Sequence, residues 1–121
     1  MAGLNDNGHD AQLAGLVASA VYASLHTADP GTTGTSEVTG GSPAYARKAI
    51  TWGTPATSSV AMAATLPVFN VPAATTISYL GYWSQLATGG TFYGSRALSS
   101  PETYGGQGTY SITSATESVS G

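Results

Sequence analysis

The chain has 121 residues, enough for one compact domain, and carries three basic and six acidic residues, or 7% of the chain, against about 25% in an ordinary soluble domain. The net charge of −3 and the pI near 4.9 exclude a nucleic-acid binder that works by neutralising phosphates. The absence of cysteine excludes disulfides and thiolate zinc sites, so packing or assembly must stabilise the fold.

The N-terminal segment shows no targeting signal. It lacks a basic flank, and its apolar stretch from Leu13 to Leu25 is interrupted by Gly15, Ser19 and Ser24. We therefore expect neither a signal peptide nor a membrane partner.

A short helix is predicted near the N-terminus. Leu13, Leu16, Val17 and Ala20 recur at the spacing of one helical face, and Asp10 can accept a hydrogen bond from the free amides of the first turn. The helix is therefore expected over residues 10–20. The polar, glycine-containing residues 1–9 are expected to form an N-terminal arm before a single domain of residues 10–121.

The hydrophobic period changes to two at Val21, which predicts a first strand that ends at His26. One face of this strand carries Val21, Ala23 and Leu25, and the other carries Tyr22, Ser24 and His26.

A turn and a long loop follow the first strand. After Asp29, Pro30 fixes φ at the turn and Gly31 supplies a positive φ. The polar stretch from Thr32 to Ala44 is expected to cross the surface as a functional loop.

Six further strand-like runs are separated by proline and glycine, among them Pro101, and cover residues 45–52, 58–63, 68–71, 75–83, 91–98 and 109–113. The pattern predicts an all-β fold with a short N-terminal helix, an antiparallel β-sandwich that is jelly-roll-like. The expected core is Val21, Leu25, Ile50, Trp52, Val60, Met62, Val68, Ile77, Tyr79, Trp83, Phe92, Leu98, Tyr110 and Ile112.

The sequence offers few groups for catalysis, and we expect no enzyme and no cofactor. No serine lies in a Gly-x-Ser-x-Gly elbow. His26 with Asp29 and Glu37 is a conceivable metal set, but a histidine that bonds the backbone at a strand end is the favoured interpretation. A glycan hydrolase would need two carboxylates from Asp29, Glu37 and Glu102.

Charged residues flank the long loop. Asp29 and Glu37 bracket the turn, and Arg47 can pair bidentately with a carboxylate and fasten the loop to the sheet. The alternative is a solvated pair that contributes little.

Aromatic residues offer a possible contact surface for sugars or proteins. The candidates are Tyr79, Tyr82, Trp83, Tyr93 and Tyr104, of which Tyr82, Tyr93 and Tyr104 are taken as the contact surface. The alternative is that these rings lie in the core.

One run of residues carries a resemblance to a known family. It reads Leu25-His-Thr-Ala-Asp-Pro-Gly-Thr-Thr-Gly34, followed by Glu37, Gly40-Gly41 and Tyr45-Ala-Arg47. It resembles small virion proteins of tailed phages, many of them actinobacterial, described as tail fibre or capsid decoration proteins. The resemblance implies a turn at Asp29, Pro30 and Gly31, with Glu37 and Arg47 as loop anchors and Tyr45 as the apolar foot of the loop.

The resemblance implies a structural protein of the virion, made in the host cytoplasm. Because the sequence has no collagen-like or heptad shaft, we expect a capsid decoration protein that self-associates as a homotrimer and binds the major capsid protein on the capsid surface. The alternative is a tail fibre or receptor-binding module that recognises a host cell-surface glycan.

Overall fold

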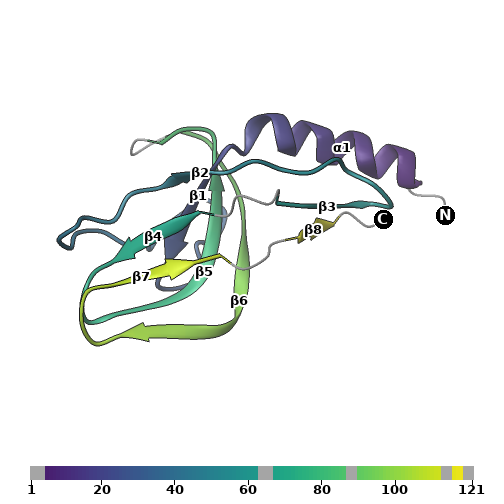
Figure 1. Cartoon of the computed structure of the whole chain (residues 1–121). Coiled ribbons are helices and arrows are strands. Elements are labelled where there is room, and N and C mark those ends of the chain that lie inside the picture. Colours follow the sequence, from purple (N-terminus) through teal and green to yellow (C-terminus); the bar gives the residue numbers. More distant parts are fainter. Residues whose placement is uncertain (1–4, 63–66, 87–89, 113–115, 119–121) are drawn as a thin grey trace.

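A computed structural model of the chain describes residues 5–62, 67–86, 90–112 and 116–118. These residues contain one helix and eight strands. The elements are α1 (Asp6–Ser19), β1 (Tyr22–His26), β2 (Lys48–Ala49), β3 (Ser59–Ala61), β4 (Val68–Val71), β5 (Thr75–Trp83), β6 (Phe92–Tyr104), β7 (Gly108–Ser111) and β8 (Thr116–Ser118) (Figure 1). All five strand pairings are antiparallel. The predicted all-β class with one N-terminal helix is confirmed.

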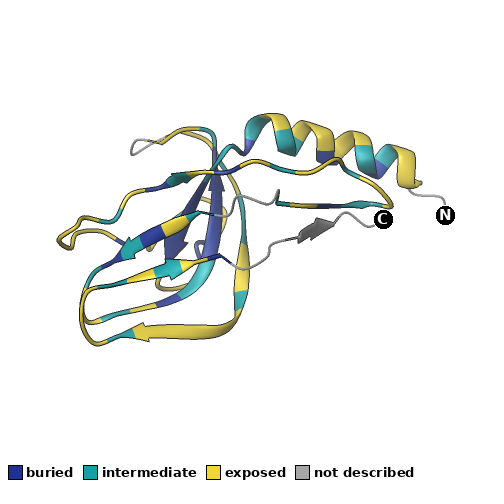
Figure 2. Ribbon diagram, viewed as in Figure 1, coloured by how far each residue is buried: buried dark blue, intermediate teal, exposed yellow. Residues whose placement is uncertain are grey.

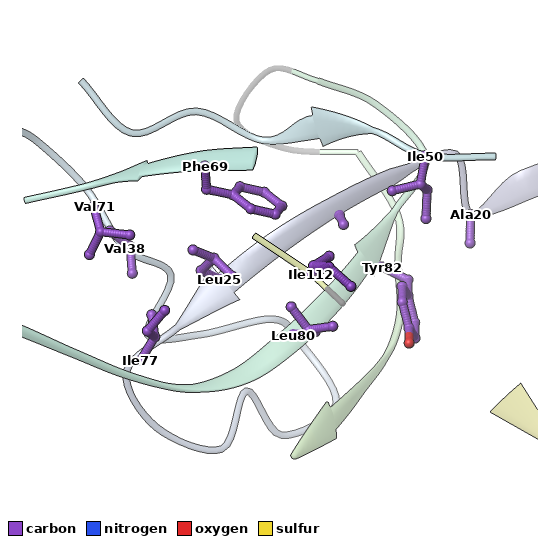
Figure 3. Packing of buried hydrophobic residues seen from close by; sticks show 11 residues of the cluster. Ala20, Leu25, Val38, Ile50, Phe69, Val71, Ile77, Leu80, Tyr82 and Ile112 are labelled. Carbon is purple, nitrogen blue, oxygen red and sulfur yellow. The ribbon is translucent and has the colours of Figure 1, made fainter. Parts of the chain in front are cut away.

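Two layers enclose the core. The larger sheet has the order β2-β1-β5-β6, and the β4-β7 pair lies across one of its faces (Figure 1). Leu25 and Leu80 from the sheet meet Phe69 of β4, with Ile112 beside them (Figure 3). Burial of these apolar side chains is the main driving force for this arrangement.

The centre of the larger sheet is covered on both faces. Four consecutive residues of β1, from Ala23 to His26, are buried, and so are the last four of β5, from Leu80 to Trp83 (Figure 2). In a sheet covered on one face only, burial would alternate along each strand. The second face is therefore covered as well, and the long loop after β1 supplies part of that cover.

The helix begins earlier than the sequence predicts. Its N-cap is Asn5, whose side chain accepts a hydrogen bond from the Gly8 amide. Asp10 is not the cap, because its carboxylate accepts from the backbone amide of Ser58 at 2.9 Å. Residues 6–9 of the expected arm are thus helical, whereas residues 1–4 lie outside the described residues. The division into arm and domain stays a prediction.

The last strands also depart from the prediction. Pro101 does not separate two strands but lies within β6, which continues to Tyr104. The pairing of β6 with β5 jumps from Ala97 to Glu102, so the intervening residues form a bulge that lets the strand bend and keep Pro101 out of the ladder. The short strand β8 was not expected, and the predicted strand ends at Ala63 and Thr113 lie outside the described residues.

The expected core is confirmed at Leu25, Ile50, Val60, Ile77, Trp83 and Ile112, which are all buried. The prediction was wrong for Val68, which is 50% exposed while its neighbour Phe69 is fully buried. A four-residue strand gives too few alternations to set its phase from sequence. The other expected core residues are half-buried, namely Val21, Trp52, Met62, Tyr79, Phe92, Leu98 and Tyr110. Buried hydrophobic residues outside the list of expected core residues are Leu13, Ala20, Ala23, Val38, Phe69, Val71, Leu80 and Tyr82.

Candidate functional site

The loop between β1 and β2 is bound along the edge of β1. Glu37 forms an antiparallel bridge with His26, and the Val38 amide donates to the Leu25 carbonyl at 3.0 Å. The strand β2 pairs only with the first two residues of β1, Tyr22 and Ala23. The two neighbours therefore leave a gap in the ladder at the amide of Leu25.

A tyrosine hydroxyl fills this gap. The Leu25 amide donates to the Tyr45 hydroxyl at 3.0 Å, and this hydroxyl donates to Glu37 Oε2 at 2.8 Å. Burial, with the negative charge of Glu37, raises the pKa of Tyr45 above its ordinary value. The hydroxyl stays protonated and can serve both groups at once. Tyr45 also stacks on Phe69 of the core, with ring centroids 6.3 Å apart.

Glu37 and Arg47 form a bidentate ion pair at the base of the loop. Arg47 Nε donates to Oε2 at 3.0 Å and Nη2 donates to Oε1 at 2.9 Å. Arg47 Nη1 donates to the Gln85 carbonyl at 3.1 Å, and the guanidinium lies 3.7 Å from the centroid of the Trp83 ring. Only 4% of the arginine side chain and 20% of the glutamate side chain are exposed. The pair is therefore enclosed and is not a solvated surface pair.

The turn after β1 lies over Trp83. Asp29 Oδ1 accepts from the Gly31 amide at 2.9 Å, and Gly31 has a φ of 63°. The Pro30 carbonyl accepts from the Gly34 amide at 3.0 Å. Gly34 has a φ of 79°, and a Cβ at this position would overlap the Trp83 ring. Glycine is required here for two separate reasons, the backbone conformation and the close approach.

A buried chain of hydrogen bonds lies under this turn. Trp83 Nε1 donates to Ser24 Oγ at 2.8 Å, Ser24 Oγ lies 2.6 Å from His26 Nε2, and His26 Nδ1 lies 2.7 Å from the Thr35 carbonyl. A carbonyl only accepts, so the imidazole proton is on Nδ1 and the Ser24 hydroxyl donates to Nε2. Burial lowers the pKa of His26, which favours this neutral form.

Ser24 Oγ and His26 Nε2 are as close as a catalytic nucleophile and its base, but their surroundings are not those of an active site. Both side chains are fully buried. The third group is a backbone carbonyl where a hydrolase uses a carboxylate, and Trp83 donates to the serine oxygen. The arrangement is that of a structural hydrogen-bond chain.

The residues considered for a metal site or for a pair of catalytic carboxylates make other contacts in the structure. Both ring nitrogens of His26 have hydrogen-bond partners, Asp29 caps the turn and Glu37 holds Arg47. Glu102 lies on β6 opposite Ile77. Within residues 5–62, 67–86, 90–112 and 116–118, no cluster of three His, Asp or Glu side chains is spaced to hold a metal ion.

The expected aromatic surface is not gathered in one place. Tyr82 was wrong as a contact residue, because it is 2% exposed and meets Trp52 edge-on in the core. Tyr93 is exposed near the start of β6, and Tyr104 is half-buried at the other end, where its hydroxyl donates to the Thr109 carbonyl. Burial and the nearby Glu102 raise the pKa of Tyr104.

An open hollow lies beside the ion pair. Its volume is about 440 Å³, and Leu86, 54% exposed, stands at its rim. The lining residues are Glu37, Val38, Thr39, Gly40, Tyr45, Ala46, Arg47 and Leu86. Of the residues that the sequence singled out around the loop, Glu37, Tyr45 and Arg47 thus line this hollow, whereas the turn residues Asp29, Pro30 and Gly31 do not.

Two parts of the site were missed in the sequence. Nothing in a local pattern shows that Tyr45 completes the ladder at Leu25. The Ser24–His26 pair did leave a signal, because residues two apart on a strand share a face. Its third member, Trp83, is 59 residues away from Ser24 and has no such signal.

The comparison with protein families decides the kind of protein. A family model described as "Podophage GP4 fiber I protein gp80" matches residues 13–120. The chain belongs to this family. The resemblance to small phage virion proteins is thereby confirmed, and the match covers the helix after its second turn, the fastened loop and the sandwich. No curated protein and no solved structure matches the chain.

Membership in this fibre family identifies a structural, virion-associated phage protein. In the described part of the chain, no helix is long and apolar enough to cross a membrane.

Proposed function

We propose that the protein is a non-enzymatic subunit of a phage fibre that binds other virion proteins through the outer surface of the loop from Thr27 to Arg47. One observation carries the proposal: the enclosed Glu37–Arg47 pair closes the base of this loop with two hydrogen bonds between the ions, and Arg47 lies against Trp83 of β5. A segment that is already ordered loses less conformational entropy when it binds.

The outer surface of this loop suits a protein contact. The two ions at its base point inward to each other, and exposed positions along the loop carry small, mostly uncharged residues such as Thr32, Thr33 and Thr39. Such a surface has little charge to desolvate on binding. The hollow beside Leu86 offers an apolar point at the edge of the same surface.

Self-association is part of the proposal. Fibre function by many weak contacts requires repeated copies, because avidity multiplies the effect of each contact. We propose a homotrimer, which sedimentation equilibrium of the purified chain tests directly: three times the mass of 12.1 kDa supports it, and a monomer at every concentration contradicts it.

A capsid decoration protein is the second candidate. The sequence has no collagen-like or heptad repeat of a shaft, which favours a compact cap over a stalk. In this case the chain would lie on the capsid surface and reinforce contacts between major capsid protein subunits, with about 800 Å² buried per partner.

Antibody labelling of intact particles separates the two candidates. Gold on the tail supports the fibre subunit, and gold on the head overturns it in favour of decoration. Binding of the purified chain to host cell-wall polysaccharide would instead support a receptor-binding module.

Loop dependence is tested by cross-linking in assembled particles. Arg47→Ala should reduce cross-links from the loop to its partner, whereas the neighbouring Lys48→Ala removes one charge without touching the pair. Equal cross-linking in both variants would contradict a role of the fastened loop.

A further inference from the structure

Two contacts join the turn of the loop to the buried hydrogen-bond chain. His26 Nδ1 donates to the Thr35 carbonyl at 2.7 Å, and the ring of Trp83 fills the space left by the missing side chain of Gly34. His26 is fully buried, so the turn and the Phe92 ring, 6.1 Å away between centroids, exclude water from it. A segment of loop is therefore part of what covers the imidazole.

A second proton on this imidazole would take away the acceptor of the Ser24 hydroxyl. It would be placed on Nε2, where the Ser24 hydroxyl now donates. Ser24 Oγ would then receive hydrogen bonds from both Nε2 and Trp83 Nε1, and the serine proton would lose its acceptor. A buried donor without a partner and a buried charge are both costly.

The charged and titratable groups that face His26 do not neutralise this cost. Glu37, the bridge partner of His26 on the loop, favours the imidazolium, and Arg47 behind it disfavours it. Glu37 is already bound bidentately to Arg47. From β5, Tyr79 stands opposite His26, and Tyr45 of the loop bonds to Leu25 and Glu37.

We propose that His26 is an acid-sensitive latch: protonation of Nε2 releases the turn from Pro30 to Thr35 from the sheet. The imidazolium gains water only if something that covers it moves. The Gly34 and Thr35 amides both donate to the Pro30 carbonyl within the turn itself, whereas β1 pairs with β5 along all five of its residues. The further step, in which this release regulates partner binding, rests on the proposed function. The latch itself belongs to the isolated chain.

Nitrogen-15 NMR of the isolated chain tests the latch. At pH 7 the imidazole of His26 should carry its proton on Nδ1, with Nε2 unprotonated and accepting. On acidification we expect a midpoint below the ordinary 6.5. The amide signals of Gly34 and Thr35 should move with that midpoint. The released population should rise about tenfold per pH unit between the ordinary pKa of histidine, which applies to the released turn, and the lowered pKa of His26 in the closed turn. A proton on Nε2 at pH 7, or loop signals that ignore the titration, would overturn the proposal.

Two histidine variants supply the matched comparison. His26→Gln removes the titration and should leave the loop signals constant across the acid range, whereas His9→Gln on α1 should leave the transition unchanged. A loop transition that persists in His26→Gln would overturn the latch. If that variant does not fold, the titration of the wild-type chain still decides. If the latch holds but labelled particles show no loop contact, only the proposed function fails.

Discussion

Replacing Arg47 by alanine should destabilise the fold much more than the loss of a surface ion pair. The change leaves the carboxylate of Glu37 enclosed without its partner, and it removes the guanidinium from the face of Trp83. Breaking a buried pair costs about 3–5 kcal/mol, whereas an exposed pair contributes about 0–1 kcal/mol. Because Glu37 keeps 20% of its side chain exposed, water partly replaces the lost partner, and we expect about 2–4 kcal/mol.

Urea unfolding followed by tryptophan fluorescence measures this loss, and Lys48→Ala is the control with the same charge change. Lys48→Ala should change the free energy of unfolding by less than about 0.5 kcal/mol. The double-mutant cycle of Arg47→Ala with Glu37→Ala should give a coupling of about 1–3 kcal/mol. If the free energy of unfolding of Arg47→Ala lies within about 0.5 kcal/mol of the wild-type value at an unchanged m-value, the ion pair does not hold the loop and the reasoning is refuted.

Three further predictions concern the same loop. Tyr45→Phe leaves the Leu25 amide without its acceptor and should cost about 1–3 kcal/mol in urea unfolding, with no change in the near-UV spectrum of the tryptophans. Gly34→Ala should cost more than Gly31→Ala, since both have a positive φ but only the former places a Cβ against an indole ring; equal losses of stability would contradict the close approach. Because burial lowers the pKa of His26 in the folded chain, the unfolded chain binds the extra proton first as the pH falls. The contribution of His26 to the free energy of unfolding is therefore complete above pH 6.5 and decreases below it, by up to about 1.4 kcal/mol per pH unit. Urea unfolding across about pH 4–8, with His26→Gln as the reference, measures this decrease.

The predicted strands differ in how closely they match the structure. The runs that contain β1 and β5 were predicted as strands, and both strands are present. In the stretch expected as a strand over residues 45–52, only Lys48–Ala49 form a strand, since Tyr45 and Arg47 turn to the loop. A side chain that serves a distant partner takes its residue out of the local pattern.

The helix start shows the same conflict between local and distant contacts. Asn5 and Asp10 are both good N-caps by residue type. The structure uses Asn5, because the carboxylate of Asp10 is bound to the Ser58 amide, 48 residues further along the chain. No short-range rule includes that partner.

Tyr82 was misplaced because the sheet is covered on both faces. Alternation separates the two sides of a strand but does not tell which side faces water. In β5 both Tyr82 and Trp83 are buried, one against the core and the other under the loop. A single-faced sheet would have left one of them exposed.

By itself, the sequence determined the class of fold and the turn after β1, because composition, period and turn chemistry are local properties, whereas Glu37, Tyr45 and Arg47 were expected as loop anchors from the resemblance to a family. Only the tertiary structure decided that Tyr45 joins the amide of Leu25 to the Glu37–Arg47 pair, and that Ser24, His26 and Trp83 form one buried chain. Hydrogen bonds satisfy buried groups wherever the fold brings a partner, and the distance along the chain has no part in that choice.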